Sequence, residues 1–285
     1  MKAGVSLYSF HGYKNSDLLG TKGCIEKAKE LGFSGLDFIE FGNFSSRAEY
    51  ISYASDIGSF CKDIGMEAVC FCVGADFINN SAKEETDRVK FLAEVAANLG
   101  CIYMRHDATR GPKNGDRSDE SFENVLPALA EAYAEVTRYA KELGVKTCIE
   151  NHGFFVQEAK RVKSIIDAVG DDNFGALIDI GNFMCADKEP TEEMKILTPH
   201  VFHAHAKDFH FRDGTLGAPE KGYFKTLAGN YLCGAILGQG CVDVEKCTNI
   251  LKESGYDGYI TLEFEGMEDP LLAIEMGKND LSKYI

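Results

Sequence analysis

The chain has 285 residues, of which 45% are hydrophobic, and its formal net charge is -15 at pH 7. This length and hydrophobic content suit one domain with a large core, and no apolar run reaches the roughly 18 residues of a membrane span. An acidic chain repels a phosphate backbone, so we expect no nucleic-acid partner, no membrane segment and no signal peptide.

One pattern recurs along the chain: a helical stretch, a glycine stop, and then an apolar run rich in β-branched or aromatic residues. The stops are Gly32, Gly65, Gly100, Gly144 and Gly255. Glycine just past a helix turns the chain sharply, and the run that follows predicts a buried strand. The predicted strands cover residues 3–10, 35–39, 66–73, 101–105, 145–150, 174–180, 201–206 and 259–265. The clearest predicted helices cover residues 84–99, 120–143, 156–169 and 244–254.

Eight such alternations predict an α/β fold, a single (β/α)8 TIM barrel over residues 1–285. The strands are apolar almost throughout, as in parallel sheets covered on both faces. An open doubly wound sheet is the alternative, but no G-x-G-x-x-G follows the first strand. After strand seven we expect a long loop insertion at about 209–242 that shapes or covers the site, with a disordered insertion as the alternative.

Chemically active side chains occur where the last four predicted strands end. They are Glu150, Asp179, His203, His205, Glu263 and Glu265. The carboxyl ends of parallel barrel strands meet at one mouth, where the active sites of this fold lie. Carboxylates crowded beside an imidazole repel one another unless a cation lies among them, and such mixed ligands suit Mn²⁺, Mg²⁺, Co²⁺ or Zn²⁺. The pattern therefore predicts a divalent metal site.

Strand periodicity leaves two choices open. Residues two apart share a face, so Glu263 and Glu265 both point inward if either does, and so do His203 and His205. Each residue alone also has an ordinary structural role, because strand-terminal carboxylates often cap helices and buried histidines often pack in cores. Only the four strand ends taken together favour a metal site.

These motifs resemble the xylose-isomerase-like barrel superfamily. Its members include sugar phosphate isomerases and epimerases, inosose dehydratases, dehydroshikimate dehydratase, ketose 3-epimerases and an apurinic endonuclease type. The resemblance covers essentially the whole chain and rests on five strings: I-E-N-H-G at 149–153, I-D-I-G-N at 178–182, H-A-K-D at 205–208, G-Q-G-C-V-D at 238–243 and G-Y-D-G-Y-I-T-L-E at 255–263. It implies one divalent metal ion per chain, with Mn²⁺ as the first choice, and four ligands: Glu150, Asp179, His205 and Glu263.

The resemblance also implies a divalent-metal-dependent isomerase or epimerase of a monosaccharide or sugar derivative, with Glu150 and Glu263 moving the proton. A metal ion acidifies the C–H beside a bound carbonyl and stabilises the enediolate that forms. The alternative is a lyase or dehydratase of an oxo-sugar or inosose, which begins with the same proton abstraction. A remote alternative is a metal-dependent endonuclease, but Asn182 stands where that type has a histidine, and the chain is acidic.

Four further residues are candidates for holding the small-molecule sugar substrate. His152 lies two residues past Glu150, and similar family members use this histidine to hold substrate. Lys207 and Arg212 follow His205 and suit an oxyanion or a sugar hydroxyl. Arginine suits a carboxylate or phosphate better, because its planar guanidinium can bind two oxygens at once. His106, after the fourth strand, could line the pocket from the other side.

Other features of the sequence bear on the substrate, the cellular compartment and the oligomeric state. The aromatic residues Tyr8, Phe10, Tyr223, Phe224 and Tyr231 are candidates to stack on apolar sugar faces, although core packing is the more frequent role. Gly238-Gln239-Gly240 could cradle a phosphate, but we favour an unphosphorylated substrate. The ten scattered cysteines form no C-x-x-C pair, which is typical of a reduced, cytoplasmic protein. A homo-oligomer is compatible with the sequence.

Overall fold

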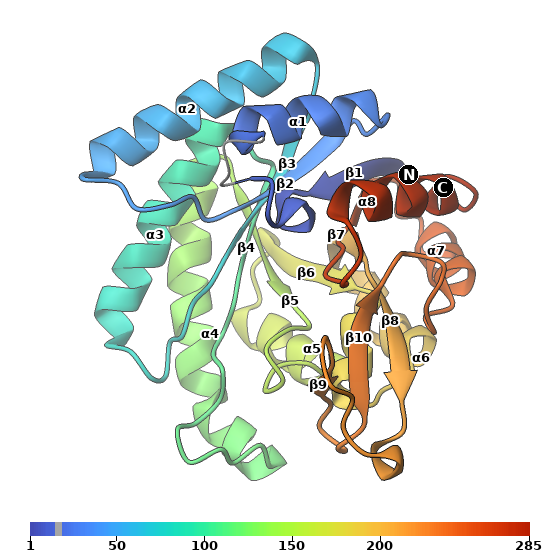
Figure 1. The fold of residues 1–285 in the computed structure, drawn as a ribbon. Helices are drawn as coiled ribbons and strands as arrows, with labels where there is room; N and C mark the ends of the chain where they lie inside the picture. The colour runs from blue at the N-terminus through green and yellow to red at the C-terminus, as the bar shows by residue number, and fades with distance from the viewer. Residues whose placement is uncertain (15–18) are drawn as a thin grey trace.

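The computed structural model describes residues 1–14 and 19–285. Within these residues eight parallel strands close into a barrel in the order β1-β11-β7-β6-β5-β4-β3-β2, which confirms the predicted TIM barrel (Figure 1). The barrel strands are β1 (Lys2–Ser6), β2 (Gly35–Ile39), β3 (Glu67–Val73), β4 (Tyr103–His106), β5 (Lys146–Glu150), β6 (Phe174–Asp179), β7 (Val201–Ala206) and β11 (Tyr259–Leu262).

Helices surround this barrel and cover the outer faces of its strands. They are α1 (Gly20–Glu30), α2 (Arg47–Ile64), α3 (Ala82–Leu99), α4 (Asp119–Glu142), α5 (Ala159–Val169), α6 (Pro190–Leu197), α7 (Val244–Glu253) and α8 (Pro270–Leu281). The five glycines predicted as helix stops all have positive φ, between 74° and 84°. Glycine adopts this left-handed conformation without the steric cost of a Cβ, so each stop sends the chain directly into the next strand.

The first and last barrel strands are shorter than predicted. β1 ends at Ser6, whose hydroxyl accepts a hydrogen bond from the N–H of Tyr8 and caps a 3-10 helix at Leu7–Phe10. The expectation that residues 7–10 continue the strand is therefore wrong. β11 ends at Leu262, so Glu263 is the first residue past the strand and reaches the mouth of the barrel.

The segment at 209–242, predicted to be a long loop, contains a three-stranded antiparallel sheet in the order β8-β10-β9. Its strands are β8 (Asp208–Arg212), β9 (Phe224–Lys225) and β10 (Tyr231–Ala235). β8 begins two residues after β7 ends, so the sheet extends from the mouth end of the barrel (Figure 1). These strands are two to five residues long and separated by glycine-containing turns, which hid their periodicity in the sequence.

Asp208 ties this small sheet to the G-Q-G turn. Its carboxylate accepts hydrogen bonds from the N–H groups of Gly238 at 3.0 Å, Gly240 at 2.8 Å and Val242 at 3.0 Å. A Cβ at Gly240 would lie 2.1 Å from Asp208 Oδ1, so only glycine fits there. The N–H groups that could cradle a phosphate are already bound to a carboxylate of the chain itself.

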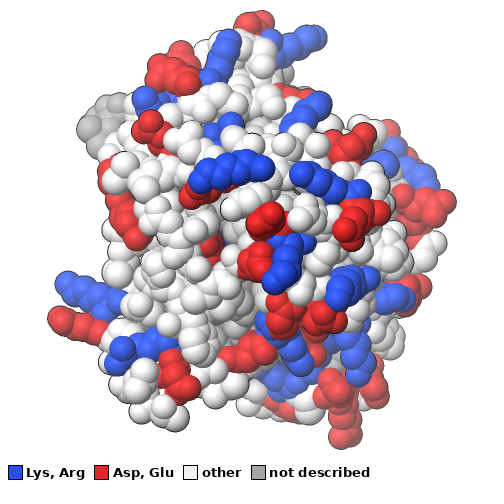
Figure 2. All heavy atoms as spheres, turned by 90° about the vertical axis from the view of Figure 1, so that its right-hand side faces the viewer, with Lys and Arg blue, Asp and Glu red and all other residues white. Residues whose placement is uncertain are grey.

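Charged side chains of both signs share the surface. Figure 2 shows the side that lies to the right in Figure 1, where acidic and basic groups are interspersed. A phosphate backbone approaching this face would meet carboxylates among the cations. All ten cysteines are free thiols and all but Cys241 are buried. Among the described residues, no helix is both long and apolar enough to cross a membrane.

Candidate metal centre

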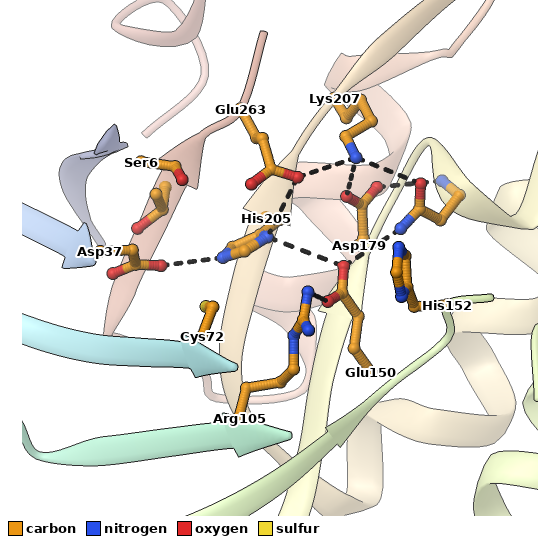
Figure 3. Close-up of polar contacts among 12 residues, drawn as sticks. Ser6, Asp37, Cys72, Arg105, Glu150, His152, Asp179, His205, Lys207 and Glu263 are labelled. Atoms are coloured by element: carbon orange, nitrogen blue, oxygen red, sulfur yellow. Dashed lines mark hydrogen bonds and ion pairs between the residues drawn. The ribbon is translucent and has the colours of Figure 1, made fainter. Parts of the chain in front are cut away.

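Four acidic or imidazole side chains converge at the mouth of the barrel (Figure 3). They lie at or just past the ends of β5, β6, β7 and β11, and they are Glu150, Asp179, His205 and Glu263. Each offers one ligand atom, and these atoms all lie within 4.8 Å of one another. The four strands are consecutive in the closed barrel, so their carboxyl ends meet at one place. The structure thus brings together the four residues that the family resemblance implied as metal ligands.

Three oxygen or nitrogen atoms of this cluster are buried without a hydrogen-bond partner among the described residues, and one of them, Glu150 Oε2, makes an ion pair with Arg105. Asp179 Oδ1 accepts hydrogen bonds from the N–H groups of Gly181 and Asn182, which leaves Oδ2 without one. His205 Nδ1 also has none and lies 3.8 Å from both Glu150 Oε1 and Glu263 Oε2. Buried polar atoms are rarely left unpaired, and a set of carboxylate oxygens with one imidazole nitrogen suits a divalent cation. The donor set therefore fits a metal ion.

A buried carboxylate on the far side of His205 decides which of its nitrogens faces the cluster. Asp37 Oδ2, from β2, lies 2.8 Å from His205 Nε2 and 2.6 Å from His203 Nε2, and all three side chains are fully buried. His205 Nδ1 is thereby left toward Glu150 and Glu263, whereas His203 contacts Asp37 and Thr261. The structure therefore places His205, and not His203, in the four-residue cluster. Asp37 was not among the residues predicted from the sequence, although it is the one charged residue in a five-residue strand.

We expect Asp37→Asn to weaken binding of a divalent ion by about 10- to 100-fold, because carboxylates that hold a ligand histidine orient its ring and raise its basicity. Titration of Mn²⁺ against a competing chelator measures this change directly. His203→Gln is the matched control, since it removes the other imidazole on the same carboxylate and keeps His205 in place. Equal losses in the two variants would show that the pocket merely requires intact packing.

Lys207 lies against the cluster and is also buried. Its Nζ is 2.8 Å from Glu263, 3.5 Å from Asp179 and 3.7 Å from Glu265. Burial lowers the pKa of Lys207, but the carboxylates of Glu263 and Glu265 outweigh it and the pKa is raised well above its ordinary value. Of these carboxylates, Glu263 makes the shortest ion pair and belongs to the four-residue cluster. Glu265 is more exposed and lines a cavity at the mouth of the barrel.

Two acids of the cluster, Asp179 and Glu263, have opposite pKa shifts. Burial raises the pKa of Asp179 to about 6. The ammonium of Lys207 acts to lower this pKa, and the negative charge of Glu150 acts to raise it. Burial also acts to raise the pKa of Glu263, but Lys207 and His205 outweigh it and hold this pKa well below its usual range. Carboxylates crowded in this way disfavour one another's ionisation, and a bound cation would relieve that repulsion.

A second chain of contacts runs from Glu150 to His152 through two residues that the sequence analysis did not select. Arg105 Nη2 is 2.5 Å from Glu150 Oε2, and its Nη1 is 3.1 Å from Asp107 Oδ1. The same Asp107 oxygen is 2.9 Å from His152 Nδ1. Burial lowers the pKa of His152, but Asp107 outweighs it, so the pKa is raised. The string M-R-H-D carried the signal, because Arg105 and Asp107 lie two residues apart and share a face.

Two predicted substrate-binding residues lie away from the cluster. His106 is fully buried, with its ring stacked 4.2 Å from that of Tyr133 in α4, and burial lowers its pKa to about 4. Arg212, in β8, donates hydrogen bonds to the carbonyls of Leu216 and Gly217. Neither His106 nor Arg212 lines the cavity at the mouth of the barrel, whereas the other two predicted substrate-binding residues, His152 and Lys207, do.

A cavity of about 370 Å³ opens beside Lys207. Its lining residues are Tyr8, His152, Gly153, Phe154, Gln157, Asn182, Cys185, Lys207, Gly222, Phe224, Gly234 and Glu265. A larger hollow of about 590 Å³ lies between the C-terminal parts of α2 and α3 and contains none of the clustered acids. None of the four clustered residues lines the smaller cavity either, but Lys207 does, and its ammonium lies 2.8 Å from Glu263, so this cavity leads to the cluster.

Fold and cluster together define a class of protein: TIM barrels that gather three carboxylates and an imidazole at the mouth. Residues 25–279 match the family described as "Xylose isomerase-like TIM barrel". The chain belongs to this family, which confirms the resemblance seen in the sequence.

Curated relatives and solved structures agree with this assignment. The inosose dehydratase of Clostridium beijerinckii is 23% identical over 277 residues, which span 92% of this chain and 89% of the relative. That of Serratia proteamaculans is 29% identical over 227 residues, spanning 74% and 73%. The structure of "IOLI protein with a binding zinc atom" superposes with a TM-score of 0.75 at 19% identity, covering 100% of this chain and 99% of the other. The 3-keto-D-glucoside 4-epimerase YcjR of E. coli gives 0.71 at 15%, with coverage of 99% of each chain.

Proposed function

We propose that the protein is a metal-dependent lyase that removes water from an oxo-sugar or oxo-cyclitol. The observation that carries this proposal is the convergence of Glu150, Asp179, His205 and Glu263 beside a pocket that holds Lys207 and His152. The family resemblance seen in the sequence implied isomerase or epimerase chemistry first. The curated relatives named inosose dehydratase support the alternative better, so we place dehydration first.

The four clustered side chains would hold one divalent ion. When bound, the ion would polarise a substrate carbonyl and acidify the adjacent C–H. Mn²⁺ is our first choice, and the titles of two structures similar in fold mention zinc and magnesium. Asp179 and His205 are best suited to ligation alone, because their other polar atoms are already bound to backbone N–H groups and to Asp37.

The remaining residues suit the proton transfers of a dehydration. Glu150 or Glu263 takes the proton from the carbon beside the carbonyl, and the electron pair left behind forms the new carbon–carbon double bond. The buried ammonium of Lys207 stabilises the negative charge that develops on the carbonyl oxygen of the substrate. His152 is held by Asp107 through Nδ1, so Nε2 is available to give a proton to the departing hydroxyl, which leaves as water.

Epimerisation is the second candidate, for a specific reason. Glu150 and Glu263 come from different strands on either side of His205, and two carboxylates could remove and return a proton on opposite faces of a substrate. The same first step serves both reactions, and they differ in whether a leaving group departs.

The test is to incubate the Mn²⁺-loaded protein with a panel of inososes, oxo-sugars and ketoses in D2O and to record product masses. We expect a product that has lost one water. An isomer that keeps the mass of the substrate apart from one incorporated deuterium would identify an epimerase and reject the lyase. No product from any substrate, although elemental analysis shows bound metal, would reject both.

A further inference from the structure

The pocket beside Lys207 has a polar part and an apolar part. The polar part consists of His152, Asn182, Lys207 and Glu265, which can pair with the hydroxyl and carbonyl groups of a sugar ring. The apolar part includes two half-buried phenylalanines, Phe154 and Phe224, which we call the aromatic wall.

The aromatic wall joins two segments that are far apart in the sequence. Phe154 follows β5, whereas Phe224 lies in β9 of the small sheet, and their ring centroids are 6.4 Å apart with planes at 83°. Phe224 packs in turn edge-on against the fully buried Phe209, at 5.7 Å. This support from the core holds the exposed edge of the wall in one place.

Phe154 has an uncommon backbone conformation. Its φ is 65°, and a bulky residue at positive φ is disfavoured by contact of its Cβ with the backbone. Gln157 holds this turn, because its Oε1 accepts a hydrogen bond from the N–H of Phe154 at 2.7 Å. Strained residues that the surrounding structure holds in this way concentrate at ligand sites.

Gln157 has no side-chain donor left for a ligand. Its Nε2 donates to the carbonyls of Asn151 at 3.0 Å and Asn182 at 2.7 Å, and the residue is 2% exposed. The hydroxyls of a free sugar placed against the aromatic wall would therefore lose water without gaining a partner from this side chain, which is unfavourable. An apolar group at the same place would bury its surface at no such cost.

We infer that the aromatic wall binds an apolar, ring-bearing substituent of the substrate, so that the substrate is an oxo-sugar glycoside with an aromatic or otherwise apolar aglycone. This inference rests on the proposed function, because the polar part of the pocket must hold the oxo ring. The volume of about 370 Å³ lies within the range of roughly 300–1,000 Å³ of pockets that hold ligands larger than one small ring.

Binding is tested with unreactive probes, phenyl and methyl β-glucopyranoside, titrated calorimetrically into the full-length Mn²⁺-loaded protein. We expect the phenyl glycoside to bind about tenfold more tightly, from ring stacking and apolar burial. Phe224→Leu and Phe154→Asn should reduce this difference to about threefold or less, and asparagine tolerates the positive φ of position 154. Phe211→Leu is the matched control, because Phe211 belongs to the same small sheet but lies outside this pocket.

Equal affinity for the two glycosides would overturn the inference, and so would an equal loss in Phe211→Leu and Phe224→Leu. Turnover of the corresponding oxo-glucosides separates this inference from the proposed function. Aglycone-selective binding without turnover of any oxo-sugar would reject the lyase and keep the aromatic wall as a binding site. Turnover with no preference for the phenyl aglycone would keep the lyase and reject the role of the wall.

Discussion

Glu150→Gln is expected to abolish stable metal binding and to lower kcat/KM by about 10³-fold or more, because one change removes a proposed metal ligand and a candidate base. The side chain is 1% exposed and lies 3.8 Å from Nδ1 of His205. Glutamine preserves the shape and the contact with Asn182 Nδ2, but it cannot supply an anionic oxygen.

The same substitution has two opposed effects on the protein without metal. It removes one of several mutually repelling acids, and it leaves the guanidinium of Arg105 with Asp107 as its remaining carboxylate partner. We expect the loss of the ion pair between Arg105 and Glu150 to outweigh the relief of repulsion between the acids, because this 2.5 Å contact is direct and buried. The metal-free variant should therefore be less stable than the metal-free wild type.

Elemental analysis of both purified proteins gives the stoichiometry, and denaturant unfolding after chelation gives the stability. Glu265→Gln is the control, since Glu265 also lies close to Lys207 but is outside the four-residue cluster. It should retain close to one metal ion per chain. Metal retained in Glu150→Gln, or lost equally in Glu265→Gln, would contradict the assignment of ligands.

Lys207→Met is expected to separate metal binding from catalysis. Removing an ammonium 2.8 Å from Glu263 and 3.5 Å from Asp179 lowers the positive charge beside the ion, so affinity for Mn²⁺ should rise, by about tenfold. Activity should fall by about 10²- to 10³-fold, because the same group would stabilise the negative charge that develops on substrate oxygen.

Without metal, Lys207→Met should lose about 3 kcal/mol of stability, since the variant leaves buried carboxylates without their cation. Added Mn²⁺ should restore more stability to the variant than to the wild type, which thermal unfolding with and without metal measures. Lys225→Met, an exposed lysine of the small sheet, serves as control. A parallel fall of metal affinity and activity in Lys207→Met would show instead that Lys207 only supports the shape of the site.

Much of the fold follows from local patterns in the chain. The glycine stops and apolar runs predicted all eight barrel strands, because helix termination and strand burial depend on residues close together in the sequence. The same patterns set the acids at strand ends, and parallel closure of the barrel then required their carboxyl ends to meet. These patterns selected the strand-end residues Glu150, Asp179, His203, His205, Glu263 and Glu265, and the family resemblance then implied Glu150, Asp179, His205 and Glu263 among them.

Other features depend on contacts across the barrel that no local pattern encodes. Asp37 in β2 meets His203 and His205 in β7 because closure of the barrel brings non-neighbouring strands together inside it, and this contact distinguishes the two histidines. Alternation along β4 turns Arg105 toward Glu150 and His106 toward α4, a choice that depends on the direction of the strand's inner face. The sequence by itself determined which residue types reach the mouth. Only the tertiary structure decided which of them meet, because a side chain's partners are set by strands that are distant along the chain.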